Sequence, residues 1–127
     1  MSIYTAKLPW PPKELSPNAR GHWAKKAKAA KAYKEACIWT LKEWQVRRIN
    51  APGLKIHVTF YRPTKHKHDM DNLIARFKAG QDAIAAQTGI DDAYFDVTHE
   101  IAPETGGYVI ARISAPLVNI EHRGQIS

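Results

Sequence analysis

The sequence predicts a single α+β domain over residues 1–116, in which a mixed sheet of about four strands packs with two helices in the order β-α-β-α-β-β. Two long segments repeat apolar side chains at helical spacing. Several short segments alternate apolar and polar side chains between turn-forming residues, which is typical of strands. A chain of 127 residues can build one hydrophobic core but has little room for two domains. Residues 117–127 are predicted to form a flexible tail.

The first half is predicted to contain a strand at residues 3–8, a long loop and a helix at residues 23–48. The strand ends at Pro9-Trp10-Pro11-Pro12, because successive prolines remove backbone donors. Apolar side chains recur along the helix in steps of three, four or seven residues, at Trp23, Ala27, Ala30, Cys37, Leu41 and Trp44. We therefore expect Cys37 to be a buried structural thiol, and core packing of the tryptophans is favoured over stacking on bases.

The second half begins with the clearest strand of the sequence, residues 54–61, where alternation is regular. A second helix is predicted at residues 71–88, with Gly89 as a left-handed cap. Its inward-facing residues are predicted to be Leu73, Phe77, Gly80 and Ile84. Strands at residues 95–101 and 108–114 are expected to pair as a hairpin closed by Gly106-Gly107.

Positive charge is concentrated in the first half of the chain. The net charge is +7, but residues 1–68 hold 15 Lys or Arg and three acids, whereas residues 69–127 hold four and nine. A basic half favours a polyanionic partner, although a solvated surface has the same composition. Phosphate contact is the preferred interpretation of these basic residues. The residues predicted to contact the phosphates of a nucleic acid are Lys25, Lys28, Lys31, Lys65, Lys67 and Arg76.

Several classes of protein are disfavoured by what the sequence lacks. No apolar run reaches the length of about 18 residues that spans a bilayer, and the first residues lack the layout of a secretory signal, so we expect a cytoplasmic protein without a membrane partner. A single cysteine excludes an internal disulfide. His66 and His68 lack further zinc ligands at suitable spacing, so proximity to DNA phosphate is the better interpretation.

Two carboxylates, Asp69 and Asp71, follow the basic segment Lys65-His66-Lys67-His68 at the expected start of the second helix. Residues two apart share a side of an extended segment, so the pair could bind one cation. The simpler alternative is that Asp71 caps the helix and that both carboxylates are solvated.

The helix that follows carries a polar stripe. Asp71, Lys78 and Asp82 are separated by seven and four residues and return to nearly one azimuth. Asp91 and Asp92 lie just beyond the helix, and the next strand could bring them back to its start. Clustered carboxylates repel unless a cation joins them, and Mg²⁺ prefers such oxygens. The chemistry that suits this cluster is phosphodiester hydrolysis by metal-activated water, with Lys78 neutralising charge on the phosphorane.

Four motifs in order over residues 3–114 resemble the RusA family of Holliday junction resolvases. They are Leu8-Pro9-Trp10-Pro11-Pro12 with Asn18, Asp69-Met70-Asp71-Asn72-Leu73, Lys78 to Asp82-Ala83-Ile84, and Gly89-Ile90-Asp91-Asp92. The resemblance implies a homodimeric, Mg²⁺-dependent endodeoxyribonuclease, with Mn²⁺ able to substitute, that makes paired nicks at four-way junctions in DNA recombination and repair. It also implies that the metal ligands are Asp69, Asp71 and Asp92, that Lys78 is the catalytic lysine, and that Asp91 is a neighbour.

One position departs from the family pattern. The lysine expected four residues after the second aspartate is Ala75 here, so Lys78 fits only with about three inserted residues, and Arg76 is a competing cation. Without the resemblance, the residues indicate only a basic protein with a carboxylate metal site. Two alternatives therefore stay open, a DNA-binding module without catalysis and a metal-dependent nuclease that acts on linear DNA or RNA.

Overall fold

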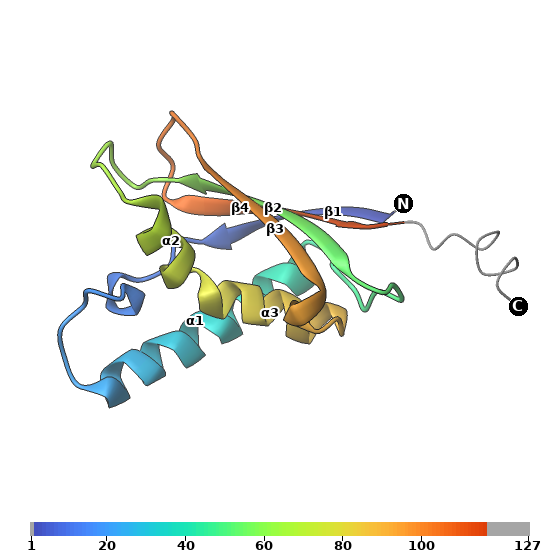
Figure 1. The fold of residues 1–127 in the computed structure, drawn as a ribbon, viewed down its shortest axis with the longest axis horizontal. Coiled ribbons are helices and arrows are strands. Elements are labelled where there is room, and N and C mark those ends of the chain that lie inside the picture. Colours follow the sequence, from blue (N-terminus) through green and yellow to red (C-terminus); the bar gives the residue numbers. More distant parts are fainter. Residues whose placement is uncertain (1, 117–127) are drawn as a thin grey trace, which may run out of the picture.

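The computed structural model describes residues 2–116, which form a mixed sheet with its helices on one face (Figure 1). The four strands are β1 (Ser2–Pro9), β2 (Leu54–Tyr61), β3 (Phe95–Ile101) and β4 (Tyr108–Ala115). The helices are α1 (Trp23–Glu43), α2 (Met70–Arg76) and α3 (Lys78–Thr88), with short 3₁₀ helices η1 (Lys13–Leu15) and η2 (Asp92–Tyr94). The predicted α+β class is confirmed. The predicted tail, residues 117–127, lies outside the described residues.

The strand order is β1-β4-β2-β3, with β2 and β3 parallel and the other neighbours antiparallel. The predicted hairpin between the last two strands is therefore wrong. The turn before β4 bonds to β2 instead, since the backbone N–H of Gly107 donates to Tyr61 O at 2.8 Å. The inward residues of β4 are fully buried, whereas those of β3 are half-buried. The pairing places β4 inside the sheet, between β1 and β2, and leaves β1 and β3 at its edges.

The core lies between the sheet and the helices. Leu54, Ile56, Val58 and Phe60 face inward from β2, and Cys37 is fully buried on α1, as predicted. The prediction that the tryptophans pack in the core holds for Trp10, which lies against it. It is wrong for the three tryptophans of the first helical segment, because Trp23, Trp39 and Trp44 are 76%, 67% and 46% exposed. All residues from 21 to 28 are exposed, so the first turns of α1 have no core to pack against.

The ends of the helices differ from the predicted ends. The first helix stops at Glu43, before the predicted residue 48, because Gln45 adopts a left-handed conformation with φ of 63°. The predicted second helix is divided into α2 and α3 at Phe77, whose backbone N–H is shared between Leu73 O at 3.0 Å and Ile74 O at 3.2 Å. Such sharing is common at helix ends. The predicted left-handed cap at Gly89 is confirmed, with φ of 79°.

The ring of Phe77 explains why glycine occupies position 80. The ring packs edge-on against Phe60, with centroids 6.0 Å apart. It also lies over Gly80, where an added Cβ would be 2.5 Å from a ring carbon. The predicted inner face of the segment is confirmed by the burial of Leu73, Phe77, Gly80 and Ile84.

Candidate active site

The carboxylates of Asp69 and Asp71 lie at the start of α2. Asp69 is the N-cap residue in an extended conformation, with no side-chain capping bond, and Asp71 lies in the first helical turn. Both residues are exposed, and neither carboxylate has a hydrogen bond or ion pair within residues 2–116. The alternative in which Asp71 caps the helix is therefore wrong, because the helix begins before it. Two neighbouring carboxylates are left available to an external ligand.

Lys78, at the start of α3, has the opposite environment. Its Nζ donates to Asp82 Oδ1 at 3.0 Å and to Asp92 Oδ2 at 2.8 Å. The predicted side-by-side placement of Lys78 and Asp82 on the helix is thus confirmed. The hydrogen bond to Asp92, followed by that to Asp82, raises the pKa of Lys78, and the hydrogen bond from Lys78 lowers the pKa of Asp92. At neutral pH this cluster consists of an ammonium group between two carboxylates.

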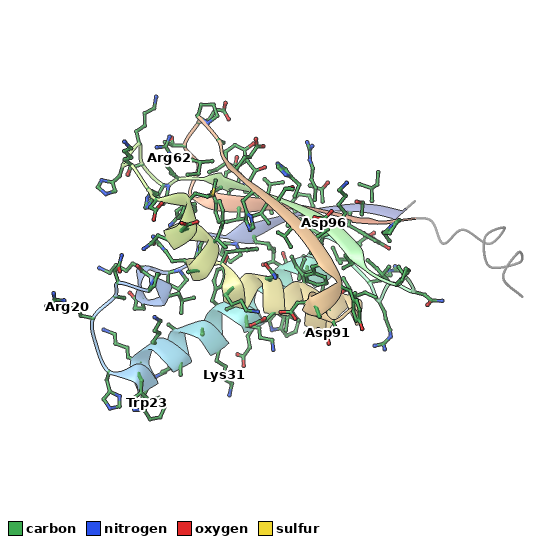
Figure 2. The ribbon with its side chains drawn as sticks, viewed as in Figure 1. Arg20, Trp23, Lys31, Arg62, Asp91 and Asp96 are labelled. Atoms are coloured by element: carbon green, nitrogen blue, oxygen red, sulfur yellow. The ribbon has the colours of Figure 1, made fainter. Side chains whose placement is uncertain are left out.

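Asp91 has a local structural role. Its Oδ1 accepts a hydrogen bond from the backbone N–H of Ala93 at 2.9 Å, so it caps η2. In Figure 2 it lies at the base of β3, next to the turn that leads from α3 into that strand. This contact separates its role from that of Asp92, whose carboxylate is turned to Lys78.

The structure does not bring the three predicted metal ligands together as one set. Asp69 and Asp71 lie at the start of α2, whereas Asp92 is bonded at the start of α3, and the seven residues of α2 rise about 10 Å between the two positions. Within residues 2–116, no group of three or more His, Cys, Asp or Glu side chains is arranged to hold a metal ion. Mg²⁺ is commonly bound by one or two carboxylates together with water and substrate phosphate. Asp69 and Asp71 are exposed carboxylates of the kind that such a site uses, although the helical conformation of Asp71 removes the extended geometry on which their predicted pairing rested.

The predicted phosphate-binding residues fall into two environments. Five of them are exposed lysines: Lys25, Lys28 and Lys31 on α1, and Lys65 and Lys67 in the loop before α2. Lys31 points away from the body of the protein in Figure 2. Arg76 is only 7% exposed, and its Nη2 donates to Pro11 O at 2.7 Å. It therefore does not belong to the exposed lysine surface, and it contacts none of the predicted metal ligands, unlike Lys78.

The two histidines before Asp69 pack against other aromatic rings. The ring of His68 lies edge-on to His66, with centroids 5.5 Å apart, and to Trp10, at 5.8 Å. Burial, and then the charge of Arg76, lower the pKa of His68. These contacts give His68 a packing role beside the carboxylates.

Sequence reasoning missed Ser16. Its Oγ accepts a hydrogen bond from Asn72 Nδ2 at 2.8 Å and from the backbone N–H of Asn18 at 3.2 Å. It thereby ties the loop after η1 to the residue that follows Asp71. The Ser16-Pro17-Asn18 sequence is typical of a turn, but only the structure reveals the link to α2.

No family model matches this chain. The chain is 43% identical over 98 residues to an uncharacterized protein of Xylella fastidiosa (strain Temecula1 / ATCC 700964). The matched segment covers 74% of this chain and 63% of that protein, so the chain spans less than two thirds of its relative. Among the helices of the described residues, none has both the length and the apolar character required to cross a membrane.

Proposed function

We propose that this protein is a cytoplasmic, Mg²⁺-dependent endodeoxyribonuclease that resolves four-way DNA junctions by paired nicks during recombination and repair. The observation that carries the proposal is the pair Asp69 and Asp71, two exposed carboxylates without partners in the described chain, placed directly after an exposed basic segment. The choice of a four-way junction rests on the RusA-like motifs.

The proposed roles follow from the environment of each group. Asp69 and Asp71 would hold Mg²⁺, which when bound supplies a Lewis acid and an activated water for phosphodiester hydrolysis. Lys65 and Lys67, just before them, contact the phosphates of the same DNA strand. Lys78 is kept protonated by its two carboxylates, so its ammonium group is available to offset charge that develops on the phosphorane.

Asp92 is the third ligand that the resemblance implies. In the described structure its carboxylate is paired with Lys78. As a ligand, Asp92 would exchange this ammonium group for the cation. Because the two positions lie about 10 Å apart along α2, this exchange would need a movement of the backbone that carries Asp92, and it would release Lys78 toward the phosphate.

The proposal includes a homodimer. A four-way junction has approximate two-fold symmetry, and two nicks placed symmetrically require two matched sites, which a two-fold dimer supplies. Light scattering at micromolar concentration, with and without junction, tests this part. A strict monomer in both conditions contradicts it.

The decisive experiment is cleavage of a synthetic mobile four-way junction with Mg²⁺ and with EDTA, followed by mapping of the nicks. We expect paired, symmetric nicks that require the metal and Mn²⁺ to replace Mg²⁺. Linear duplex DNA and RNA of the same sequence are the substrate controls. Equal cleavage of these controls would reassign the protein as a nuclease without junction preference.

One observation favours a second candidate, a basic DNA-binding protein without catalysis. The described part of a single chain holds no three-ligand metal cluster. This candidate predicts junction binding with no nicks in any divalent cation. Gel-shift and cleavage assays on the same protein sample separate the two functions.

A further inference from the structure

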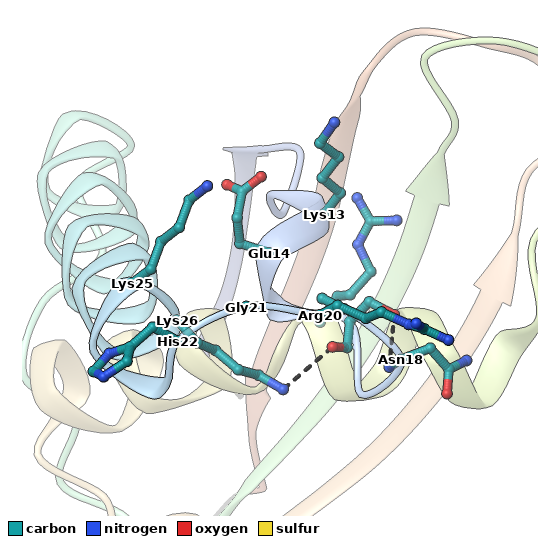
Figure 3. A pocket seen from close by; sticks show the side chains of 11 residues that line it. Lys13, Glu14, Asn18, Arg20, Gly21, His22, Lys25 and Lys26 are labelled. Atoms are coloured by element: carbon teal, nitrogen blue, oxygen red, sulfur yellow. Dashed lines mark hydrogen bonds between the residues drawn. The ribbon is translucent and has the colours of Figure 1, made fainter.

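A basic hollow of about 430 Å³ lies between η1, the loop that follows it and the first turn of α1 (Figure 3). Its cationic lining comes from Lys13, Arg20, Lys25, Lys26 and Arg76, and Glu14 is its one acidic residue. The volume falls in the range of pockets that take small molecules and exceeds what a bare inorganic ion fills. An excess of positive charge over negative in one concave site favours an anionic ligand.

Arg76 is the residue that distinguishes this hollow from an ordinary basic surface. Its side chain is more than nine-tenths buried, and it lines the hollow. Nη2 donates to Pro11 O, but Nε has no hydrogen-bond partner, and no carboxylate of residues 2–116 lies within ion-pair distance of the guanidinium. Burying a cation is costly unless it is paired. Nε itself is buried out of reach of a ligand, so an anion in the hollow would offset the charge of the guanidinium without bonding to Nε.

The wall of the hollow is tied to both neighbouring helices. Lys26 Nζ on α1 donates to Ser16 O at 3.2 Å, and Asn72 on α2 donates to Ser16 Oγ. Figure 3 shows Lys25 and Lys26 projecting from α1 on one side and Lys13 and Arg20 on the other. The side chains of Lys13, Arg20 and Lys25 make no hydrogen bonds within the described chain, so their charges are available to a ligand.

We propose that this hollow is a phosphate-binding pocket, distinct from the carboxylates of α2, that takes one backbone phosphate of the bound DNA strand with its sugar. The identity of the strand rests on the proposed function, whereas the preference for a phosphate rests on the pocket itself. A guanidinium is suited to phosphate because it presents a planar fork of donors. Since Ser16 joins the pocket to Asn72, the residue after Asp71, a phosphate held here sets the register of the strand against the two carboxylates.

The test uses ¹⁵N-labelled protein in EDTA, titrated first with inorganic phosphate and then with an unstructured thymidine decamer. We expect the amide signals of residues 21–26 and the Nε–H signal of Arg76 to shift with both probes. The double variant Lys13→Gln/Lys26→Gln should bind both at least about tenfold more weakly, because each charge-assisted hydrogen bond contributes more than a neutral one.

The charge-matched control is Lys42→Gln/Lys55→Gln, which removes two exposed lysines that lie outside the hollow. The proposal that the hollow binds phosphate is contradicted if neither probe shifts these signals. It is also contradicted if the control variant weakens binding as much as the pocket variant does. If phosphate shifts them and the decamer does not, the site takes a free phosphate compound and the DNA assignment is overturned. Because the measurement needs neither metal nor cleavage, its failure is separate from a failure of the proposed nuclease activity.

Discussion

Aspartates lie at the start of α2 and around Lys78, the first residue of α3, but the two groups have opposite environments. At α2, Asp69 and Asp71 are exposed and lack partners in the described chain. At α3, Lys78 is bonded to Asp82 and Asp92, so the charges of this cluster largely neutralise one another. A group of carboxylates is therefore not by itself a binding site. The carboxylates at the start of α2 are free to bind an external cation, whereas the α3 cluster already contains the ammonium group of Lys78.

The largest effect is expected from Asp71→Asn. The change keeps the size of the side chain but removes the charge that would hold the cation, so nicking should fall about a thousandfold or more. Asp69→Asn should behave alike. The measurements are nicking rate in Mg²⁺, melting temperature and junction affinity, and the last two should stay near wild type. Asp96→Asn, on the exposed side of β3, is the matched control. If the folded Asp71→Asn variant nicks DNA at a rate near wild type, Asp71 is not part of the active site.

Replacement of the lysine tests whether the α3 cluster takes part in chemistry. Lys78→Met should lower the nicking rate about a hundredfold, the usual effect of losing one group that stabilises transition-state charge. Stability should change by no more than about 1 kcal/mol, because exposed ion pairs contribute little. Asp82→Asn removes one partner and keeps the bond between Lys78 and Asp92, so its rate should change far less. Equal rates for Lys78→Met and wild type would reduce this cluster to a surface ion pair.

The exposed lysines of α1 should affect binding and leave the chemical step unchanged. Replacing Lys25, Lys28 and Lys31 with Ala should weaken junction binding and flatten its log–log salt dependence by about 0.9 for every phosphate that the protein no longer neutralises. Affinity measured across a salt series checks this, with single-turnover nicking at saturating protein as the second readout. An unchanged slope would mean that these lysines are only solvated.

The packing of Phe77, where the segment divides into α2 and α3, can be tested at Gly80. A methyl group added there would meet the ring of Phe77, so Gly80→Ala should destabilise the protein by about 1–3 kcal/mol, as overpacking of a core does. Urea unfolding measures this. Gly106→Ala is not a suitable control, since its Cβ would meet Tyr108 at 2.4 Å. Ala86→Gly, at an exposed position of α3, separates packing from helix propensity, because it should cost about 1 kcal/mol without touching Phe77.

The smallest effect concerns the buried thiol of Cys37 on α1. Burial raises the pKa of the Cys37 thiol to about 12, so in the native protein it should resist thiol reagents at pH 8 and react on unfolding. The folded-state pKa lies above the unfolded value. The contribution of Cys37 to stability is therefore complete below the unfolded pKa and is lost as pH rises toward 12. Rapid native labelling would contradict the described burial.

The local features were predictable because periodicity reports which side of a segment faces inward. The strand at β2, the burial of Cys37, the cap at Gly89 and the alignment of Lys78 with Asp82 all follow from spacing within one segment. The two carboxylates at the start of α2 were also evident from their position after a basic run.

Periodicity does not predict which element packs against a given face of a helix or strand. Those contacts are fixed by the tertiary structure. It placed β4 between β1 and β2, so that β4 is hydrogen-bonded to a strand on each side. It left Trp23 exposed where α1 runs beyond the core. It turned Arg76 inward against Pro11 and joined Asp92 to Lys78, pairs that are 65 and 14 residues apart in the sequence. Such pairs depend on how the chain closes in space, so the spacing of residues along one segment cannot predict them.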